Sequence, residues 1–91
     1  MNEIEKLIKS GNATIIDVRS PADFMSGHAK GSINIPFNEL PDKIKEIKEM
    51  KNVLLCCTSG NKSGQAAVFL KQQGVVCENA GSWMLINELL I

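Results

Sequence analysis

The stretch Lys51-Asn52-Val53-Leu54-Leu55-Cys56-Cys57-Thr58-Ser59-Gly60-Asn61-Lys62-Ser63-Gly64 decides the fold. Its apolar run, residues 53–57, predicts a short buried strand. The small polar residues that follow predict a tight turn. Residues 65–74, which read QAAVFLKQQG, then predict an amphipathic helix that ends at a glycine. The chain therefore places a cysteine where a strand ends and a helix is about to begin.

This junction favours a negative charge at the centre of the loop. Backbone N–H groups at a helix start lack partners, and the helix dipole adds partial positive charge there. A cysteine in such a place loses its proton more easily than usual, so Cys57 is the candidate nucleophile. The alternative is an inert, buried cysteine that only packs. We predict that the substrate is bound by the loop residues Thr58, Ser59, Gly60, Asn61, Lys62 and Ser63.

Composition limits the possible functions. The chain has 91 residues, and its ten basic and ten acidic residues balance. We expect a single domain, residues 1–91, with no charge field for nucleic acid and no membrane association. No apolar run approaches the ~20 residues of a membrane span. Three cysteines and one histidine fit neither a disulfide framework nor a metal site, so we expect a cytoplasmic protein without a metal or other cofactor.

Predicted helices and strands alternate on both sides of the central stretch. The expected helices cover residues 2–9, a short turn from Ser20-Pro21 onward, one or two segments in 37–50 around Pro41, and 83–91. The other expected strands are 13–18, 32–35 and 75–78, with a turn at 80–82. This order predicts an α/β fold with a mainly parallel sheet of four or five strands and helices on both faces. In such sheets the ligand site lies beyond the carboxyl ends of the strands.

Five short motifs occur in a familiar order along the chain. They are Ile16-Asp17-Val18-Arg19, Asp23-Phe24 with Gly27-His28, Gly31-Ser32-Ile33-Asn34-Ile35-Pro36, the loop Cys57-Thr58-Ser59-Gly60-Asn61-Lys62-Ser63, and Gly81 with Trp83. Together they resemble the single-domain members of the rhodanese-like (sulfurtransferase) family. The loop is similar to that family's C-x-S-G-x-R-S active-site loop.

Three departures from the family pattern are visible. Lys62 stands where many members carry arginine, which leaves substrate preference open. Ser82 replaces the second glycine of a G-G-x element. The chain starts at the first helix, where members often have a preceding edge strand, so a four-stranded sheet is expected.

The resemblance implies a sulfurtransferase that moves a sulfane sulfur from a donor such as thiosulfate to a thiophilic acceptor through a Cys57 persulfide. Its partners would be a small sulfur donor and a thiol or protein acceptor. One alternative is a non-catalytic or persulfide-carrier module that acts with protein partners. A third is a phosphatase-like or arsenate-reductase-like activity, for which the loop would be counted as C-x5-K from Cys56.

Cys56 competes with Cys57 for the chemistry. The Ser59-Gly60-Asn61 register fits a six-residue loop counted from Cys57, so we expect Cys56 to be structural and to face the packing of the sheet. Neighbouring residues of a strand point to opposite faces, which argues against a disulfide between the two cysteines. A role as a resolving thiol is the alternative. Phosphoryl chemistry also favours the planar fork of arginine over the point charge of Lys62.

Residues outside the loop are assigned mainly structural roles. The resemblance implies that Arg19 and Asp23, four residues apart, form a structural ion pair that braces the first loop; a role in catalysis is the alternative. We expect Asp17 to hold the neighbouring loop by hydrogen bonds. His28 is expected to be structural, since a preformed thiolate needs no base. Cys77 is assigned to the core, and Trp83 to the core or the lip of the pocket.

Individual loop residues have alternative interpretations. Lys62 either supports the thiolate or an anionic substrate, or is a solvated lysine at a helix start. Ser63 offers a hydroxyl to the loop or caps the helix. Gly60 is expected to adopt a backbone angle that other residues resist.

Overall fold

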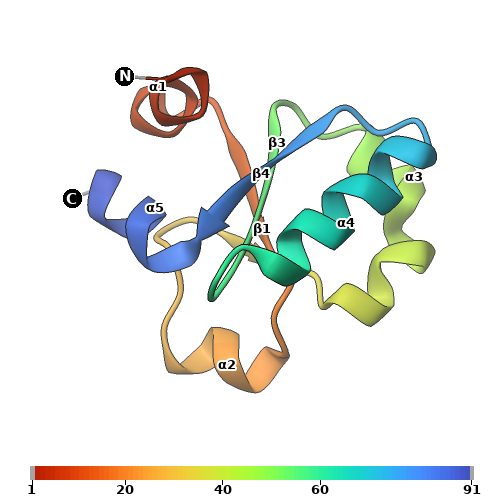
Figure 1. Cartoon of the computed structure of the whole chain (residues 1–91), viewed down its shortest axis with the longest axis horizontal. Helices are drawn as coiled ribbons and strands as arrows, with labels where there is room; N and C mark the ends of the chain where they lie inside the picture. The colour runs from red at the N-terminus through yellow and green to blue at the C-terminus, as the bar shows by residue number, and fades with distance from the viewer. Residues whose placement is uncertain (1, 91) are drawn as a thin grey trace.

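The computed structural model describes residues 2–90, and in them strand β3 is an inner strand of a four-stranded, all-parallel sheet (Figure 1). The spatial order of the strands is β2-β1-β3-β4. Their bounds are Thr14–Asp17 for β1, Ile33–Asn34 for β2, Val53–Cys57 for β3 and Cys77–Ser82 for β4. The predicted α/β class and the parallel sheet are confirmed.

Helices cover both faces of this sheet, as Figure 1 shows. On one face α1 and α5 lie against each other; on the other lie α4, α3 and the 3-10 helix η1. Helix α2 follows β1 at the carboxyl edge of the sheet. The helices are α1 (Glu3–Ser10), α2 (Pro21–Ser26), η1 (Phe37–Lys43), α3 (Ile44–Lys48), α4 (Asn61–Gln72) and α5 (Trp83–Leu89).

The side chains of β3 point alternately into two separate hydrophobic cores. Leu55 and Cys57 belong to a buried cluster with residues of α4 and α3, whereas Leu54 and Cys56 belong to a second cluster with residues of α1 and α5. All five side chains of β3 are buried. Period-two alternation in a strand that is covered on both faces explains why its sequence is continuously apolar.

Two predicted boundaries are wrong. Helix α4 begins at Asn61 and not at Gln65, so Lys62 and Ser63 belong to its first turn. Strand β4 is Cys77–Ser82, whereas the sequence predicted a strand at 75–78 and a turn at 80–82. The two valines at 75 and 76 favoured the earlier position by β-propensity, but pairing with β3 determines where the strand lies. An irregularity shifts the register from Leu55↔Asn79 to Cys56↔Gly81, and Gly81 accommodates it with φ +86°.

The remaining elements follow the sequence closely. Residues 37–48 divide into η1, which contains Pro41, and α3. Asn2 and Glu5 form a capping box at the start of α1. Of the predicted closing helix 83–91, residue 91 lies outside the described residues. Within residues 2–90, none of the helices has the length and apolar character needed to cross a bilayer.

Candidate active site

Cys57 ends β3 and opens onto a cleft of about 350 Å³ at the carboxyl edge of the sheet. Helix α4 and the loop before it form one wall, and the segment that follows β1 forms the other. This is the position at which parallel α/β sheets bind ligands. The cleft is lined by Val18, Arg19, Ser20, Asp23, Cys57, Thr58, Ser59, Asn61 and Lys62.

The Cys57 sulfur lies in a cradle of hydrogen-bond donors. The backbone N–H groups of Gly60 and Ser63 donate to Sγ, with N···S distances of 3.0 and 3.4 Å, and the Ser63 Oγ lies 3.3 Å from it. Burial opposes ionisation, but the Ser63 hydroxyl and the N–H groups of Ser63, Gly60 and Ser59 outweigh it, so the pKa of Cys57 is lowered below its ordinary value. The sulfur is therefore prepared to carry a negative charge at the start of α4.

The conformation of Gly60 makes the cradle possible. Its φ of +91° lies in the left-handed region, which turns its N–H toward the sulfur. A Cβ at this position would also lie 3.1 Å from the Gly81 Cα of the neighbouring strand. The predicted need for glycine here is confirmed, and the register irregularity of β4 adds the steric reason.

Cys56 does not reach the cleft. Its side chain is fully buried in the cluster under α1 and α5, on the face opposite Cys57. Burial, together with the nearby Asp17 carboxylate, raises the pKa of Cys56 to about 12. Cys56 is therefore a packing residue, as predicted. Its position supports neither a role as a resolving thiol nor a seven-residue loop that starts at Cys56. Burial likewise raises the pKa of Cys77, which lies in the core.

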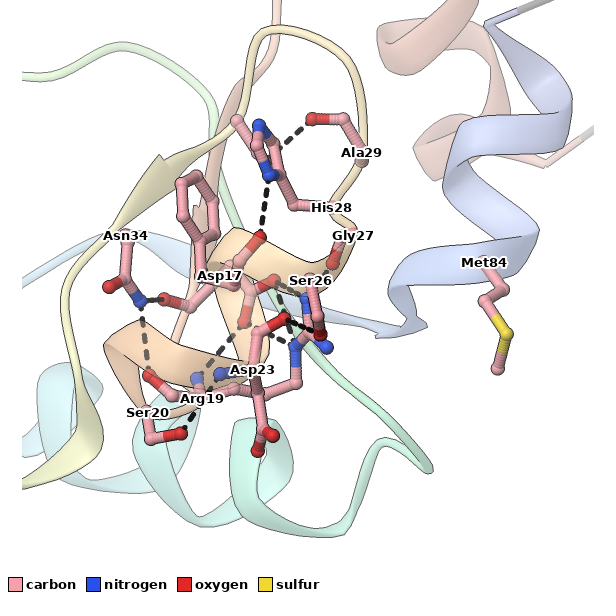
Figure 2. A network of polar contacts seen from close by, with 12 residues as sticks. Asp17, Arg19, Ser20, Asp23, Ser26, Gly27, His28, Ala29, Asn34 and Met84 are labelled. Atoms are coloured by element: carbon pink, nitrogen blue, oxygen red, sulfur yellow. Dashed lines mark hydrogen bonds and ion pairs between the residues drawn. The ribbon is translucent and has the colours of Figure 1, made fainter.

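The predicted Arg19–Asp23 ion pair is wrong, because Arg19 pairs with Asp17 (Figure 2). The Arg19 Nη2 lies 2.7 Å from Asp17 Oδ2, Arg19 Nε donates to both carboxylate oxygens, and Nη2 also donates to the Gly27 carbonyl. Hydrogen bonding to Asp17 raises the pKa of Arg19. The alternation of β1 brings these two side chains to the same side, since they are two residues apart. The Asp23 side chain instead lines the cleft.

This ion pair braces the segment between β1 and β2. The Arg19 guanidinium lies 4.8 Å from the centre of the Trp83 ring, which also packs within 3.1 Å of where a Gly27 Cβ would lie. Asn34 donates to the carbonyls of Asp17 and Arg19, which fixes the turn from the other side. The role predicted for Asp17 is thus correct, and Trp83 supports the wall of the site.

Lys62 lines both the cleft and an adjoining hollow of about 380 Å³. Its ammonium lies 5.6 Å from the centre of the Phe37 ring in that second hollow. The N–H groups and the Ser63 hydroxyl, not Lys62, account for the lowered pKa of Cys57. Lys62 therefore borders the cleft but is not among the groups that lower the pKa of Cys57.

The structure brings most of the predicted site residues together. Thr58, Ser59, Asn61 and Lys62 line the cleft with Cys57, while Gly60 and the fully buried Ser63 contact the sulfur from behind. His28 stacks on Phe24 and bonds to its carbonyl, and it does not line the cleft. Among the described residues, no group of three or more His, Cys, Asp and Glu side chains is arranged to hold a metal ion.

Sequence reasoning missed Asn79. Its side chain contacts both Gly60 and Ser63 from β4. An asparagine placed just after the predicted 75–78 strand looks like a loop residue, and only the true position of β4 brings it beside the first turn of α4.

The fold and the sulfur cradle define a class of small parallel α/β proteins with an activated cysteine at a strand–helix junction. The chain belongs to the rhodanese-like domain family, whose model matches residues 1–88.

The chain is similar to a thiosulfate sulfurtransferase, to an uncharacterized protein and to a rhodanese-related protein of known structure. The chain is 41% identical over 69 residues to thiosulfate sulfurtransferase PspE of Escherichia coli (72% of this chain, 66% of PspE) and 42% identical over 62 residues to the uncharacterized protein YqhL of Bacillus subtilis (68% of this chain, 49% of YqhL). It thus spans about half to two thirds of the length of these relatives. The crystal structure of a rhodanese-related protein from Thermoplasma volcanium superposes with a TM-score of 0.77 at 33% identity, over 94% of this chain and 85% of that one.

Proposed function

We propose that the protein is a sulfurtransferase in which Cys57 carries a sulfane sulfur from a donor such as thiosulfate to a thiophilic acceptor. The observation that carries this proposal is the cradle of donors on a single sulfur atom. The Gly60 and Ser63 N–H groups and the Ser63 hydroxyl all converge on Cys57 Sγ within 3.4 Å. The similarity to PspE, a thiosulfate sulfurtransferase, supports the same reaction.

In the first half-reaction the Cys57 thiolate attacks the outer sulfur of thiosulfate. A new S–S bond forms, the S–S bond of the donor breaks, and sulfite leaves with its electron pair. Cys57 now carries a persulfide. The preorganised N–H groups stabilise the sulfur anion without reorganising during the reaction.

In the second half-reaction a nucleophile attacks the outer sulfur of the persulfide. With cyanide the product is thiocyanate, and the Cys57 thiolate is regenerated as the leaving group. A thiol acceptor would take the sulfur in the same way and become a persulfide itself. This is covalent catalysis in two steps, for which ping-pong kinetics are expected.

The position of Cys56 disfavours the phosphatase-like alternative. That reading counts the loop from Cys56, but the Cys56 side chain packs under α1 and α5 and does not line the cleft. Lys62 also lacks the planar fork that grips a phosphoryl group.

Intact-mass spectrometry after thiosulfate treatment tests the proposal. The wild type and Cys56→Ser should gain the mass of one sulfur atom, and cyanide should remove it with formation of thiocyanate. Cys57→Ser should gain nothing. A folded wild type that takes up no sulfur would refute the proposal, and a persulfide that forms but is not turned over by cyanide would indicate a carrier.

A further inference from the structure

Asn79 lies on β4 directly opposite Leu55, at the point where the register with β3 shifts. From there its side chain spans the start of α4 and contacts the two residues that hold the Cys57 sulfur. Nδ2 donates to the Gly60 carbonyl at 3.0 Å, and Oδ1 lies 2.7 Å from Ser63 Oγ.

The backbone fixes the orientation of this amide. The Gly81 N–H donates to Asn79 Oδ1 at 3.0 Å, so an oxygen and not an NH2 group must stand there. The Asn79 oxygen therefore accepts two hydrogen bonds, one from Gly81 and one from Ser63.

This arrangement assigns the hydrogens around the sulfur. A hydroxyl has a single hydrogen, and that of Ser63 points to Asn79 because a carboxamide oxygen only accepts. With the Ser63 hydrogen in this orientation, the hydrogen between Cys57 Sγ and Ser63 Oγ, 3.3 Å apart, comes from the thiol of neutral Cys57. In the neutral state a chain of hydrogen bonds then runs from the thiol to Ser63 and on to Asn79.

Ionisation requires the Ser63 hydroxyl to turn. When the thiol proton leaves to water, Sγ becomes an acceptor only, and the Ser63 O–H is the side-chain donor nearest to it. Asn79 Oδ1 loses that donor but keeps the Gly81 N–H, so no polar atom is left without a partner. Meanwhile Asn79 Nδ2 continues to hold Gly60, whose N–H donates to the sulfur.

We propose that Asn79 is a positioning residue that controls the ionisation of Cys57 through Ser63 and Gly60. The inference rests on Cys57 as the nucleophile of the proposed function and adds a residue from a different strand to that site. Asn79 acts as a neutral acceptor that releases the Ser63 hydroxyl when the sulfur becomes charged.

Asn79→Asp tests this, because every part of the change acts in the same direction. A carboxylate holds the Ser63 hydrogen more strongly, it can no longer donate to the Gly60 carbonyl, and its charge opposes a second anion nearby. The pH profile of Cys57 alkylation by iodoacetamide should move to higher pH, and the rate at neutral pH should fall by about three- to tenfold. Asn79 is solvent-exposed on β4, so the variant leaves both cores intact.

A double-mutant cycle separates this role from the effect of charge alone. If Asn79 acts through Ser63, the shift caused by Asn79→Asp should shrink by about half or more in a Ser63→Ala background. Asn12→Asp adds the same charge just before β1, at the amino ends of the strands and so on the side of the sheet away from Cys57. It should leave the pH profile of Cys57 alkylation unchanged. An unmoved or lowered profile in Asn79→Asp, or a shift of equal size in both backgrounds, would overturn the proposal. Because alkylation needs no sulfur donor, a failure of thiosulfate transfer alone would count against the proposed function and not against the role of Asn79.

Discussion

Ser63 gives the Cys57 sulfur two contacts, one from its backbone N–H and one from its hydroxyl. Replacing it by alanine keeps the first and removes the second. A hydrogen bond to a charged group contributes about 1.5–3 kcal/mol. Ser63→Ala should therefore raise the pKa of Cys57, because the thiolate loses its side-chain donor.

The sign of the pH dependence follows from the lowered pKa of Cys57. The thiolate is the reactive form, so the alkylation rate rises with pH through the pKa and is constant above it. In the wild type this plateau begins at a lower pH than for an ordinary cysteine, and in Ser63→Ala it moves to higher pH. Ser10→Ala, at the end of α1, is the control. A Ser63→Ala profile that overlays the wild type would show that the hydroxyl contributes nothing.

Lys62 belongs to the same site but should affect a different quantity. Lys62 lines the cleft and its ammonium lies over Phe37 in the adjoining hollow, so we expect it to attract an anionic donor without setting the charge of the sulfur. We expect Lys62→Met to raise KM for thiosulfate by roughly two- to fivefold, in line with the ~0.2–1 kcal/mol of exposed charge interactions. The alkylation profile should stay in place. Lys48→Met is the control; a Lys62→Met profile shifted to higher pH would return Lys62 to supporting the thiolate.

At the scale of elements, the turn after β1 depends on the Asp17–Arg19 pair. The Asp17 side chain is fully buried and that of Arg19 is 9% exposed. Removing one partner of such a pair leaves a buried charge and costs about 3–5 kcal/mol. Asp17→Ala should lower the free energy of unfolding by about that amount, whereas Asp23→Ala should change it by less than about 1 kcal/mol. Urea denaturation followed by circular dichroism measures both, and similar losses in the two variants would contradict the pairing seen here.

The errors of sequence-based prediction also lie at this scale. Periodicity located β3 and the start of the loop because a buried strand and a turn differ sharply in composition. It misplaced β4, because the valines at 75 and 76 have higher β-propensity than the residues at 79–82 that pair with β3. The pairing of Arg19 with Asp23, which the family resemblance implied, is wrong because the alternation of side chains past the end of β1 places Arg19 beside Asp17. Because β4 was predicted at residues 75–78, Asn79 was taken for a loop residue and its role was missed.

At the scale of the whole molecule, one thiol of three should be reactive in the native state. The three cysteines are Cys56, Cys57 and Cys77, and only Cys57 lines the cleft. Burial raises the pKa of the other two. Native protein should therefore take one alkyl group rapidly and three in 8 M urea, counted by intact mass (about 8 M being a fully denaturing concentration for a small domain).

Labelling of Cys56 and Cys77 in native buffer then reports opening of the cores. Both should react only through unfolded molecules, at a rate that falls as stability rises. Asp17→Ala should accelerate it and Lys48→Met should not. Rapid labelling of two thiols in the native protein would show that a second cysteine reaches solvent.

The overall architecture was predictable because alternation of helices and strands permits few topologies. The candidate nucleophile was predictable because its loop has an unusual composition. The apolar sequence of β3 does not by itself show which of the two adjacent cysteines faces the cleft, because both faces of this strand are covered by helices. The choice of Cys57 rested on the length of the loop that follows it.

The alternation of side chains along β3 also determines whether a second thiol of the chain can react with an oxidised Cys57. Peroxide would convert the Cys57 thiolate to a sulfenic acid, which is rescued when a neighbouring thiol condenses with it. Here the adjacent thiol of Cys56 lies on the other side of the sheet, and Cys77 is held in the core. A thiol from another molecule would therefore be needed to reduce the sulfenic acid. Without one, a second equivalent of peroxide would oxidise it to the sulfinic acid, which thiols do not reverse.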